Sequence, residues 1–263
     1  KNGTVVESYE YDGLNQLVKV TNGANVTEYA YDAGGNLTSV KLNGEVQDTY
    51  GYTDAGWKDL LTSFNGQAIT YDEIGNPLAY RDGYAFTWQN SRRLATVSHG
   101  SDSISYTYDP DGIRTSKTVN GTTTKYHVMN GTLLGQTKGS DTIVFLYDEK
   151  ANRYGFDYNG TKYYYIFNVQ GDVIGILNQS GSQIVSYQYD PWGKVLSVSG
   201  SEASTIGQLN PIRYRGYYYD TETGFYYLQS RYYDPTVRRF LNADSIACEI
   251  GDLQSHNIFA YCH

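Results

Sequence analysis

The chain has 263 residues and a formal net charge of −8 at pH 7, so it lacks the excess of basic residues from which a nucleic-acid-binding face is built. Tyrosine accounts for 29 residues and glycine for 28, a composition typical of strands joined by turns, and we therefore expect an all-β protein. No apolar run approaches the roughly 18 residues of a transmembrane helix, and 2 cysteines are too few for a disulfide framework.

A Tyr-Asp dipeptide recurs along the whole chain. Its copies begin at Tyr11, Tyr31, Tyr71, Tyr108, Tyr147, Tyr189, Tyr219 and Tyr233. The first copies are roughly 20 residues apart, a period that indicates a repeat architecture. In several repeats an aliphatic residue follows at the sixth and ninth positions after the aromatic residue, as Leu37 and Val40 follow Tyr31. The residues between, such as DAGGN, predict a turn in which the Asp accepts hydrogen bonds from backbone N–H groups.

A second kind of turn is predicted by the dipeptide Asn-Gly. It occurs at Asn2, Asn22, Asn43, Asn65, Asn120, Asn130 and Asn159. Because both residues tolerate a positive φ, Asn-Gly between alternating strands is a strong hairpin signal. Each repeat therefore predicts two strands and two turns, and the array predicts a continuous spiral of antiparallel strands with little or no helix.

The repeat pattern is lost over residues 197–210, SVSGSEASTIGQLN, a small and polar stretch that predicts a connecting loop. The next segment, residues 212–240, reads IRYRGYYYDTETGFYYLQSRYYDPTVRRF and contains the last two Tyr-Asp pairs. A core is more simply built from Leu, Ile and Val, whose side chains have no polar atom to satisfy. Tyrosine must therefore supply a property that aliphatic residues lack.

The repeats YDAGGNL, YDEIGNPL, YDPDGIRT and YDPWGKV resemble the YD repeats of the Rhs family. The stretch RGYYYDTETGFYYLQSRYYDPTVRRFLNADSI, followed by NIFAYC, resembles the Rhs-repeat-associated core segment. This resemblance implies a YD-repeat β-shell over residues 1–211 and a core segment over residues 212–263. In that family the repeats wind into a hollow β-cocoon that the core segment plugs at one end. The tyrosine side chain, an apolar ring with a hydroxyl group, suits both the solvent-facing and the enclosed side of such a wall.

The resemblance also implies a function. The chain would be part of the shell of a polymorphic Rhs-type toxin of bacteria, and its partner would be the protein's own C-terminal toxin domain, enclosed by the shell. The protein would be secreted or displayed at the cell surface, with contacts to secretion or delivery proteins. No nucleic-acid partner, cofactor or metal is expected. Because an open spiral exposes edge strands, self-association through sheet edges is a further expectation.

Self-cleavage by an aspartyl protease mechanism is attributed to this family, and the candidate residues here are Asp234 in RYYDP and Asp244 in LNADS. One protonated and one ionised carboxyl, lying close together, can activate water against a peptide carbonyl. The sequence departs from the family pattern at Arg238, where Gly usually precedes Arg-Phe. Turn capping is the alternative role for both aspartates. The chain by itself is expected to have no enzymatic activity, and self-cleavage would belong to the intact protein.

The sequence is also compatible with several alternatives. Cys248, His256, Cys262 and His263 could ligate zinc, but they contain no CxxC pair and fit no standard site. The stretch TKYYYIFNVQGDVIGIL resembles one unit of bacterial choline- and glucan-binding repeats, which favours a carbohydrate-binding cell-surface protein, although the three Trp residues are irregularly placed. A structural surface or filament protein is another alternative. Teneurins, animal adhesion proteins, share the YD shell.

Overall fold

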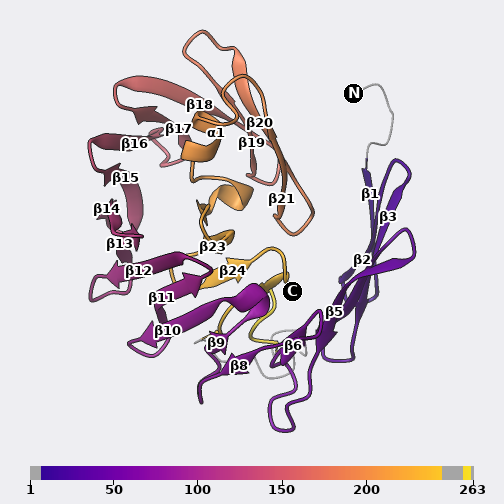
Figure 1. The fold of residues 1–263 in the computed structure, drawn as a ribbon. Helices are drawn as coiled ribbons and strands as arrows, with labels where there is room; N and C mark the ends of the chain where they lie inside the picture. The colour runs from indigo at the N-terminus through magenta and orange to yellow at the C-terminus, as the bar shows by residue number, and fades with distance from the viewer. Residues whose placement is uncertain (1–6, 245–256, 262–263) are drawn as a thin grey trace. The chain divides into compact units, whose positions relative to one another are not determined.

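The computed structural model describes residues 7–244 and 257–261. Their regular secondary structure consists almost entirely of β-strands, as predicted (Figure 1). Contacts divide the chain into two compact units. Unit 1 comprises Lys1–Phe86 together with Arg239–His263, and unit 2 comprises Thr87–Arg238.

The strands follow chain order within each long sheet, and every described pair of neighbours is antiparallel. The seven-stranded sheet consists of β1 (Glu7–Tyr11), β2 (Leu17–Asn22), β3 (Asn25–Tyr31), β4 (Leu37–Leu42), β5 (Glu45–Gly51), β6 (Ser63–Phe64) and β7 (Gln67–Ala68). The fourteen-stranded sheet consists of β8 (Thr70–Tyr71), β9 (Pro77–Ala79), β10 (Ala85–Gln89), β11 (Arg93–His99), β12 (Asp102–Tyr108), β13 (Arg114–Val119), β14 (Thr122–Met129), β15 (Thr132–Lys138), β16 (Asp141–Tyr147), β17 (Arg153–Tyr158), β18 (Thr161–Phe167), β19 (Val173–Leu177), β20 (Gln183–Tyr189) and β21 (Val195–Ser199). This order confirms the prediction of antiparallel strands that pair in the order of the chain.

Shorter elements follow the repeats. The last strands are β22 (Tyr218–Asp220), β23 (Phe225–Tyr227), β24 (Tyr232–Asp234) and β25 (Arg239–Phe240), and two short helices, α1 (Ile206–Leu209) and η2 (Tyr214–Gly216), precede them. A further short helix, η1 (Arg81–Gly83), lies between β9 and β10. The stretch 197–210, predicted as a loop, contains the end of β21 and the whole of α1. Val198 and Ile206 pack against the core of unit 2, so burial of its few apolar residues gives this polar stretch a regular structure.

The Tyr-Asp turn has the geometry that the sequence predicts. Asp32 Oδ1 accepts hydrogen bonds from the backbone N–H groups of Gly34 and Asn36, both at 2.9 Å. The same pair of bonds recurs at Asp12, Asp72, Asp148 and Asp190. The turn therefore repeats as one local structure, set by one side chain.

The Asn-Gly turns also join neighbouring hairpins. Asn43 and Gly44 both have positive φ, 51° and 86°, as this turn requires. The side chain of Asn43, in the turn after β4, then accepts a hydrogen bond from the N–H of Val26 in β3 at 2.8 Å. Equivalent bonds are made by Asn65, Asn120 and Asn159. Asn is thus used both for its backbone and for its side chain.

The tyrosine hydroxyl of the Tyr-Asp pair connects successive repeats. Tyr147 donates to the carbonyl oxygen of Leu133 at 2.7 Å. The same bond to an aliphatic residue of the preceding repeat is made by Tyr31, Tyr71, Tyr108 and Tyr189. An aliphatic side chain would bury equally well but could not satisfy this carbonyl, which explains the need for tyrosine.

Removing one such hydroxyl should destabilise the sheet measurably. In Tyr147→Phe the carbonyl of Leu133 loses its donor and Arg153 Nε loses an acceptor, so the free energy of unfolding should fall by about 1 kcal/mol. Urea denaturation of both proteins gives this difference. The matched control is Tyr154→Phe, since Tyr154 is 42% exposed, and equal stability of the two variants would show that the hydroxyl has no such role.

In unit 2 the sheet curves round the segment that contains α1, β23 and β24 (Figure 1). Residues of both belong to one hydrophobic cluster, with Phe156 and Val185 from the sheet and Ile212 and Tyr218 from the segment. The first three are at most 1% exposed. The segment that begins at residue 212 is therefore part of the core of unit 2.

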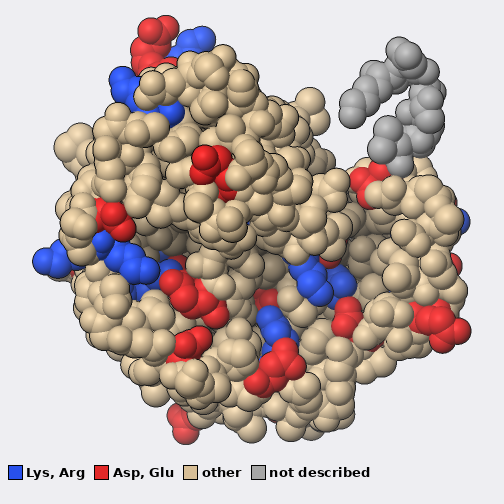
Figure 2. Space-filling view, turned by 45° about the horizontal axis from the view of Figure 1, so that its top comes forward, with Lys and Arg blue, Asp and Glu red and all other residues tan. Residues whose placement is uncertain are grey.

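The surface carries charges of both signs. On the face shown in Figure 2, acidic and basic side chains lie in small groups separated by uncharged residues. In the described part of the chain, no helix has the length and apolar character needed to cross a membrane.

Candidate functional site

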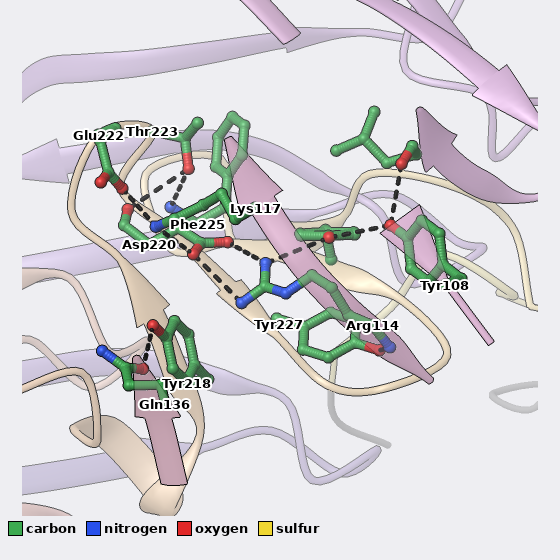
Figure 3. A network of polar contacts seen from close by, with 12 residues as sticks. Tyr108, Arg114, Lys117, Gln136, Tyr218, Asp220, Glu222, Thr223, Phe225 and Tyr227 are labelled. Carbon is green, nitrogen blue, oxygen red and sulfur yellow. Dashed lines mark hydrogen bonds and ion pairs between the residues drawn. The ribbon is translucent and has the colours of Figure 1, made fainter. Parts of the chain in front are cut away.

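A cluster of four charged residues, three of them buried and Glu222 partly exposed, joins the sheet of unit 2 to the core segment (Figure 3). Asp220, at the end of β22, is fully buried. Its carboxylate accepts hydrogen bonds from Arg114 Nη1 at 2.6 Å and Nη2 at 3.3 Å. Lys117 Nζ donates to Asp220 Oδ1 at 2.8 Å and to Glu222 Oε2 at 2.6 Å. The two cations come from β13 and the two carboxylates from the core segment, so the formal charges of this ion cluster cancel.

The repeat pattern explains why the two cations point inward. Arg114 and Lys117 occupy the sixth and ninth positions after Tyr108, where several other repeats have aliphatic residues. These are core positions, and Arg114 and Lys117 are only 2% and 4% exposed. An unpaired charge in such a place is strongly destabilising. The two cations therefore need the carboxylate of Asp220.

The guanidinium of Arg114 lies among tyrosine rings. Five ring centroids lie within about 6 Å of its central carbon, those of Tyr227 at 4.3 Å, Tyr126 at 4.7 Å, Tyr218 at 4.9 Å, Tyr106 at 5.4 Å and Tyr232 at 5.8 Å. Two of these rings come from the sheet and three from the core segment. Each ring face attracts the cation and keeps water from it. The aromatic residues of residues 212–240 thus help to bury a charge.

The electrostatics of the ion cluster favour the ionised forms of Asp220 and Lys117. Burial by itself raises the pKa of Asp220, but the charges of Arg114 and Lys117 outweigh this and hold the pKa below its usual value. Burial likewise lowers the pKa of Lys117, and the charge of Asp220 reverses this so that the pKa is raised. Both shifts keep Asp220 and Lys117 charged at neutral pH. The ion cluster is therefore suited to holding the core segment in place and not to acid-base catalysis.

A second anchor holds the core segment within unit 1. Arg239, which is 5% exposed, donates from Nη1 to the hydroxyl of Tyr52 at 2.7 Å and from Nη2 to the carbonyl of Asp59 at 2.6 Å. Asn257 Nδ2 donates to Asn36 Oδ1 at 2.9 Å. Asn36 belongs to the turn after Tyr31, so this part of the core segment is bonded directly to a repeat turn.

Comparison with known families identifies this architecture. The profile described as teneurin YD-shell matches residues 3–261. The chain belongs to the YD-shell family. This membership confirms the resemblance inferred from the YD repeats and the core segment.

Two relatives of this YD-shell are bacterial proteins. Over 260 residues it is 37% identical to the tRNA3(Ser)-specific nuclease WapA of Bacillus spizizenii, a match that covers 95% of this chain and 11% of the nuclease. Over 287 residues it is 27% identical to the double-stranded DNA deaminase toxin A of Burkholderia cenocepacia, covering 92% of this chain and 19% of the toxin. The chain therefore spans only a small part of each relative.

A solved structure shares the fold of this YD-shell. The crystal structure of TcdB2-TccC3-TEV superposes with a TM-score of 0.73 and 19% identity, covering 97% of this chain and 15% of that chain. At this level of identity the likeness concerns the fold alone. It agrees with the all-β shell fold that the sequence predicts.

The two predicted catalytic aspartates belong to different units of the YD-shell. Asp234 ends β24 in unit 2, is fully buried, and accepts hydrogen bonds at Oδ1 from the N–H groups of Thr236 at 2.9 Å and Val237 at 3.4 Å. Asp244 lies in unit 1, where its N–H donates to the carbonyl of Ile258 at 3.0 Å. Asp234 thus makes the turn contacts expected of the alternative role. The meeting of the two carboxyls as a catalytic pair stays a prediction.

The other predicted residues and the proposed domain boundary stay predictions. Cys248, His256, Cys262 and His263 lie outside the described residues. Among residues 7–244 and 257–261, no group of three or more His, Cys, Asp or Glu is placed to hold a metal ion. The proposed boundary between residues 211 and 212 lies inside unit 2, which comprises Thr87–Arg238. The division into compact units therefore does not bear on this boundary, which stays a prediction.

The ion cluster itself was missed in the sequence. A signal was available, because the repeat after Tyr108 has a cation at both positions where an aliphatic residue is expected. Asp220 gave no such signal, since an Asp follows Tyr at seven other places in the chain.

Proposed function

We propose that this YD-shell segment is the C-terminal part of a container that encloses a toxin domain of the same protein. The observation that carries the proposal is the ion cluster, in which two buried cations of the sheet are paired with Asp220 and Glu222 of the core segment. The core segment is therefore fastened to the wall at an internal site. Such fastening suits a plug that must stay in place until the protein reaches its target.

The relatives support a container over an enzyme. One is named as a tRNA nuclease and the other as a DNA deaminase toxin, although both share nearly the whole of this chain. A segment common to proteins with different named activities is more simply explained as a shell domain that both proteins have. We infer that the enclosed partner is a C-terminal toxin domain, that the protein is secreted or displayed on the bacterial surface, and that secretion or delivery proteins are further partners.

Self-cleavage after the core segment is the mechanistic part of the proposal. Asp234 and Asp244 are the candidate carboxyls, one to protonate the leaving amide and the other to activate water. What supports them is their position in the family's core motif.

The carbohydrate-binding alternative is weakened by the packing of its best repeat. Tyr165 is only 8% exposed and donates to Asn210 Oδ1 at 2.8 Å. Tyr163 stacks on Phe156 with ring centroids 5.2 Å apart. Two of the three tyrosines that would form a sugar platform are thus engaged in internal contacts.

Protease protection tests the container. In the folded full-length protein, the domain that follows the core segment should survive digestion that destroys the same domain expressed alone. Opening the shell with urea before digestion should remove the protection. Rapid digestion of that domain in the untreated, folded protein would contradict the proposal.

A further inference from the structure

A cavity of about 510 Å³ lies in unit 2 between the sheet and the core segment. Its apolar lining includes Val128 and Leu133 from the sheet side and Ile212 and Leu228 from the core segment. Arg153, at the start of β17, also lines it. The volume is within the range of sites that bind small molecules.

Arg153 holds the same repeat position as Arg114. It is the sixth residue after Tyr147, as Arg114 is the sixth after Tyr108, and it is partly buried. The two differ in their partners, because Arg114 is paired with Asp220. Within residues 7–244 and 257–261, no carboxylate forms an ion pair with Arg153.

The hydrogen bonds and ring contacts of Arg153 in the described chain all involve uncharged groups. Nε donates to the hydroxyl of Tyr147 at 2.9 Å and Nη1 to the carbonyl of Gly216 at 3.3 Å, while the guanidinium carbon lies 4.9 Å from the centroid of the Phe145 ring. Nη2 makes no hydrogen bond within this part of the protein. A guanidinium is always charged and its fork of N–H groups matches a carboxylate, so Arg153 presents an unused donor together with an uncompensated charge.

We propose that this cavity binds a carboxylate attached to an apolar group, with Arg153 as its anion-binding residue. The carboxylate occupies the place at Arg153 that Asp220 occupies at Arg114. The apolar group packs against Val128, Leu133 and Ile212. The carboxylate comes either from a free alkyl acid or from a polypeptide, and this inference does not depend on whether the shell encloses a toxin.

Titration calorimetry on the full-length protein tests the site with three probes. N-acetylphenylalanine represents a polypeptide carboxylate, octanoate a free alkyl acid, and N-acetylphenylalaninamide is the uncharged match of the first. At least one acid should bind, and N-acetylphenylalanine should bind roughly tenfold more tightly than its amide if the source is a polypeptide, because charge-assisted hydrogen bonds are the stronger ones. Tighter binding of octanoate would assign the site to alkyl acids.

Variants distinguish the contribution of the Arg153 charge to binding from that of the space in the cavity. Arg153→Gln should weaken binding of the acid roughly tenfold, to the level of an uncharged ligand, whereas Lys138→Gln, which removes an exposed charge from β15, should not. Thr132→Trp fills the cavity and leaves Arg153 in place, so it should abolish binding of every probe even if Arg153→Gln proves unstable. Binding that is unchanged in Arg153→Gln or Thr132→Trp overturns the proposal. So does the absence of binding by either acid at about 10 mM.

Discussion

Replacing Asp220 by Asn should lower the free energy of unfolding by about 3–5 kcal/mol, the usual cost of removing one partner from a buried ion pair. Asn has nearly the shape of Asp but no charge, so Arg114 and Lys117 would remain buried with only Glu222 to offset them. Urea denaturation monitored by circular dichroism gives the difference. We also expect protease to cut the core segment of this variant faster than that of the wild type.

Two further variants test whether the loss of stability in Asp220→Asn comes from the broken ion cluster. Asp148→Asn changes an exposed turn aspartate of an ordinary repeat and should have a much smaller effect. The triple variant Arg114→Met, Lys117→Met, Asp220→Leu should recover much of the lost stability, because apolar residues of similar volume often replace buried ions without loss. Wild-type stability in Asp220→Asn would show that the ion cluster does not fasten the core segment.

The pH dependence of this effect follows from the lowered pKa of Asp220. The unfolded carboxyl, with a pKa of about 3.9, takes up a proton at a higher pH than the folded one. The stabilisation is therefore present above about pH 4 and is lost as the pH falls through the folded pKa. The stability difference between wild type and Asp220→Asn should accordingly be largest near neutral pH and should shrink at pH values below about 4.

Replacing Asp244 by Asn should abolish self-cleavage of the full-length protein. Asn keeps the size and hydrogen-bonding capacity of the side chain but has no ionisable carboxyl, which general acid-base attack on an amide requires. On a denaturing gel, the wild type should run as two fragments and Asp244→Asn as one. Asp234→Asn should also abolish self-cleavage. Because Asn can still accept the turn hydrogen bonds from Thr236 and Val237, this loss would come from the missing carboxyl and not from a broken turn.

The internal control for this experiment is Asp32→Asn. Asp32 has the same Tyr-Asp context but belongs to an ordinary repeat, where it accepts bonds from Gly34 and Asn36. This variant should cleave like the wild type. Cleavage that persists in Asp244→Asn, or that fails equally in Asp32→Asn, would show that these aspartates only hold turns.

The repeats of this YD-shell could be predicted because their turns are local. Asp32 bonds to residues two and four positions away, and Asn43 adopts the positive φ that its Asn-Gly dipeptide indicates. Such turns act within a few residues, so each repeat predicts its own hairpins. Even the excess of tyrosine could be attributed to a wall with two environments, although the bond from Tyr147 to Leu133 gives it a more definite reason.

The ion cluster could not be predicted in the same way, because it is a contact across the fold. Arg114 and Asp220 are 106 positions apart, and neither has a neighbour in sequence that indicates the other. The departure from the aliphatic pattern at Arg114 and Lys117 shows that a partner is needed. It does not show which of the many acidic residues supplies it. The curvature of the sheet decides that, by bringing β22 against β13.

Single-particle electron microscopy of the full-length protein tests the central claim, that this YD-shell is part of a container, most directly. We predict a closed shell with density inside it, and continuous density leading from the core segment to that enclosed domain. Density for the C-terminal domain outside the wall, or a shell that contains only solvent, would contradict the account.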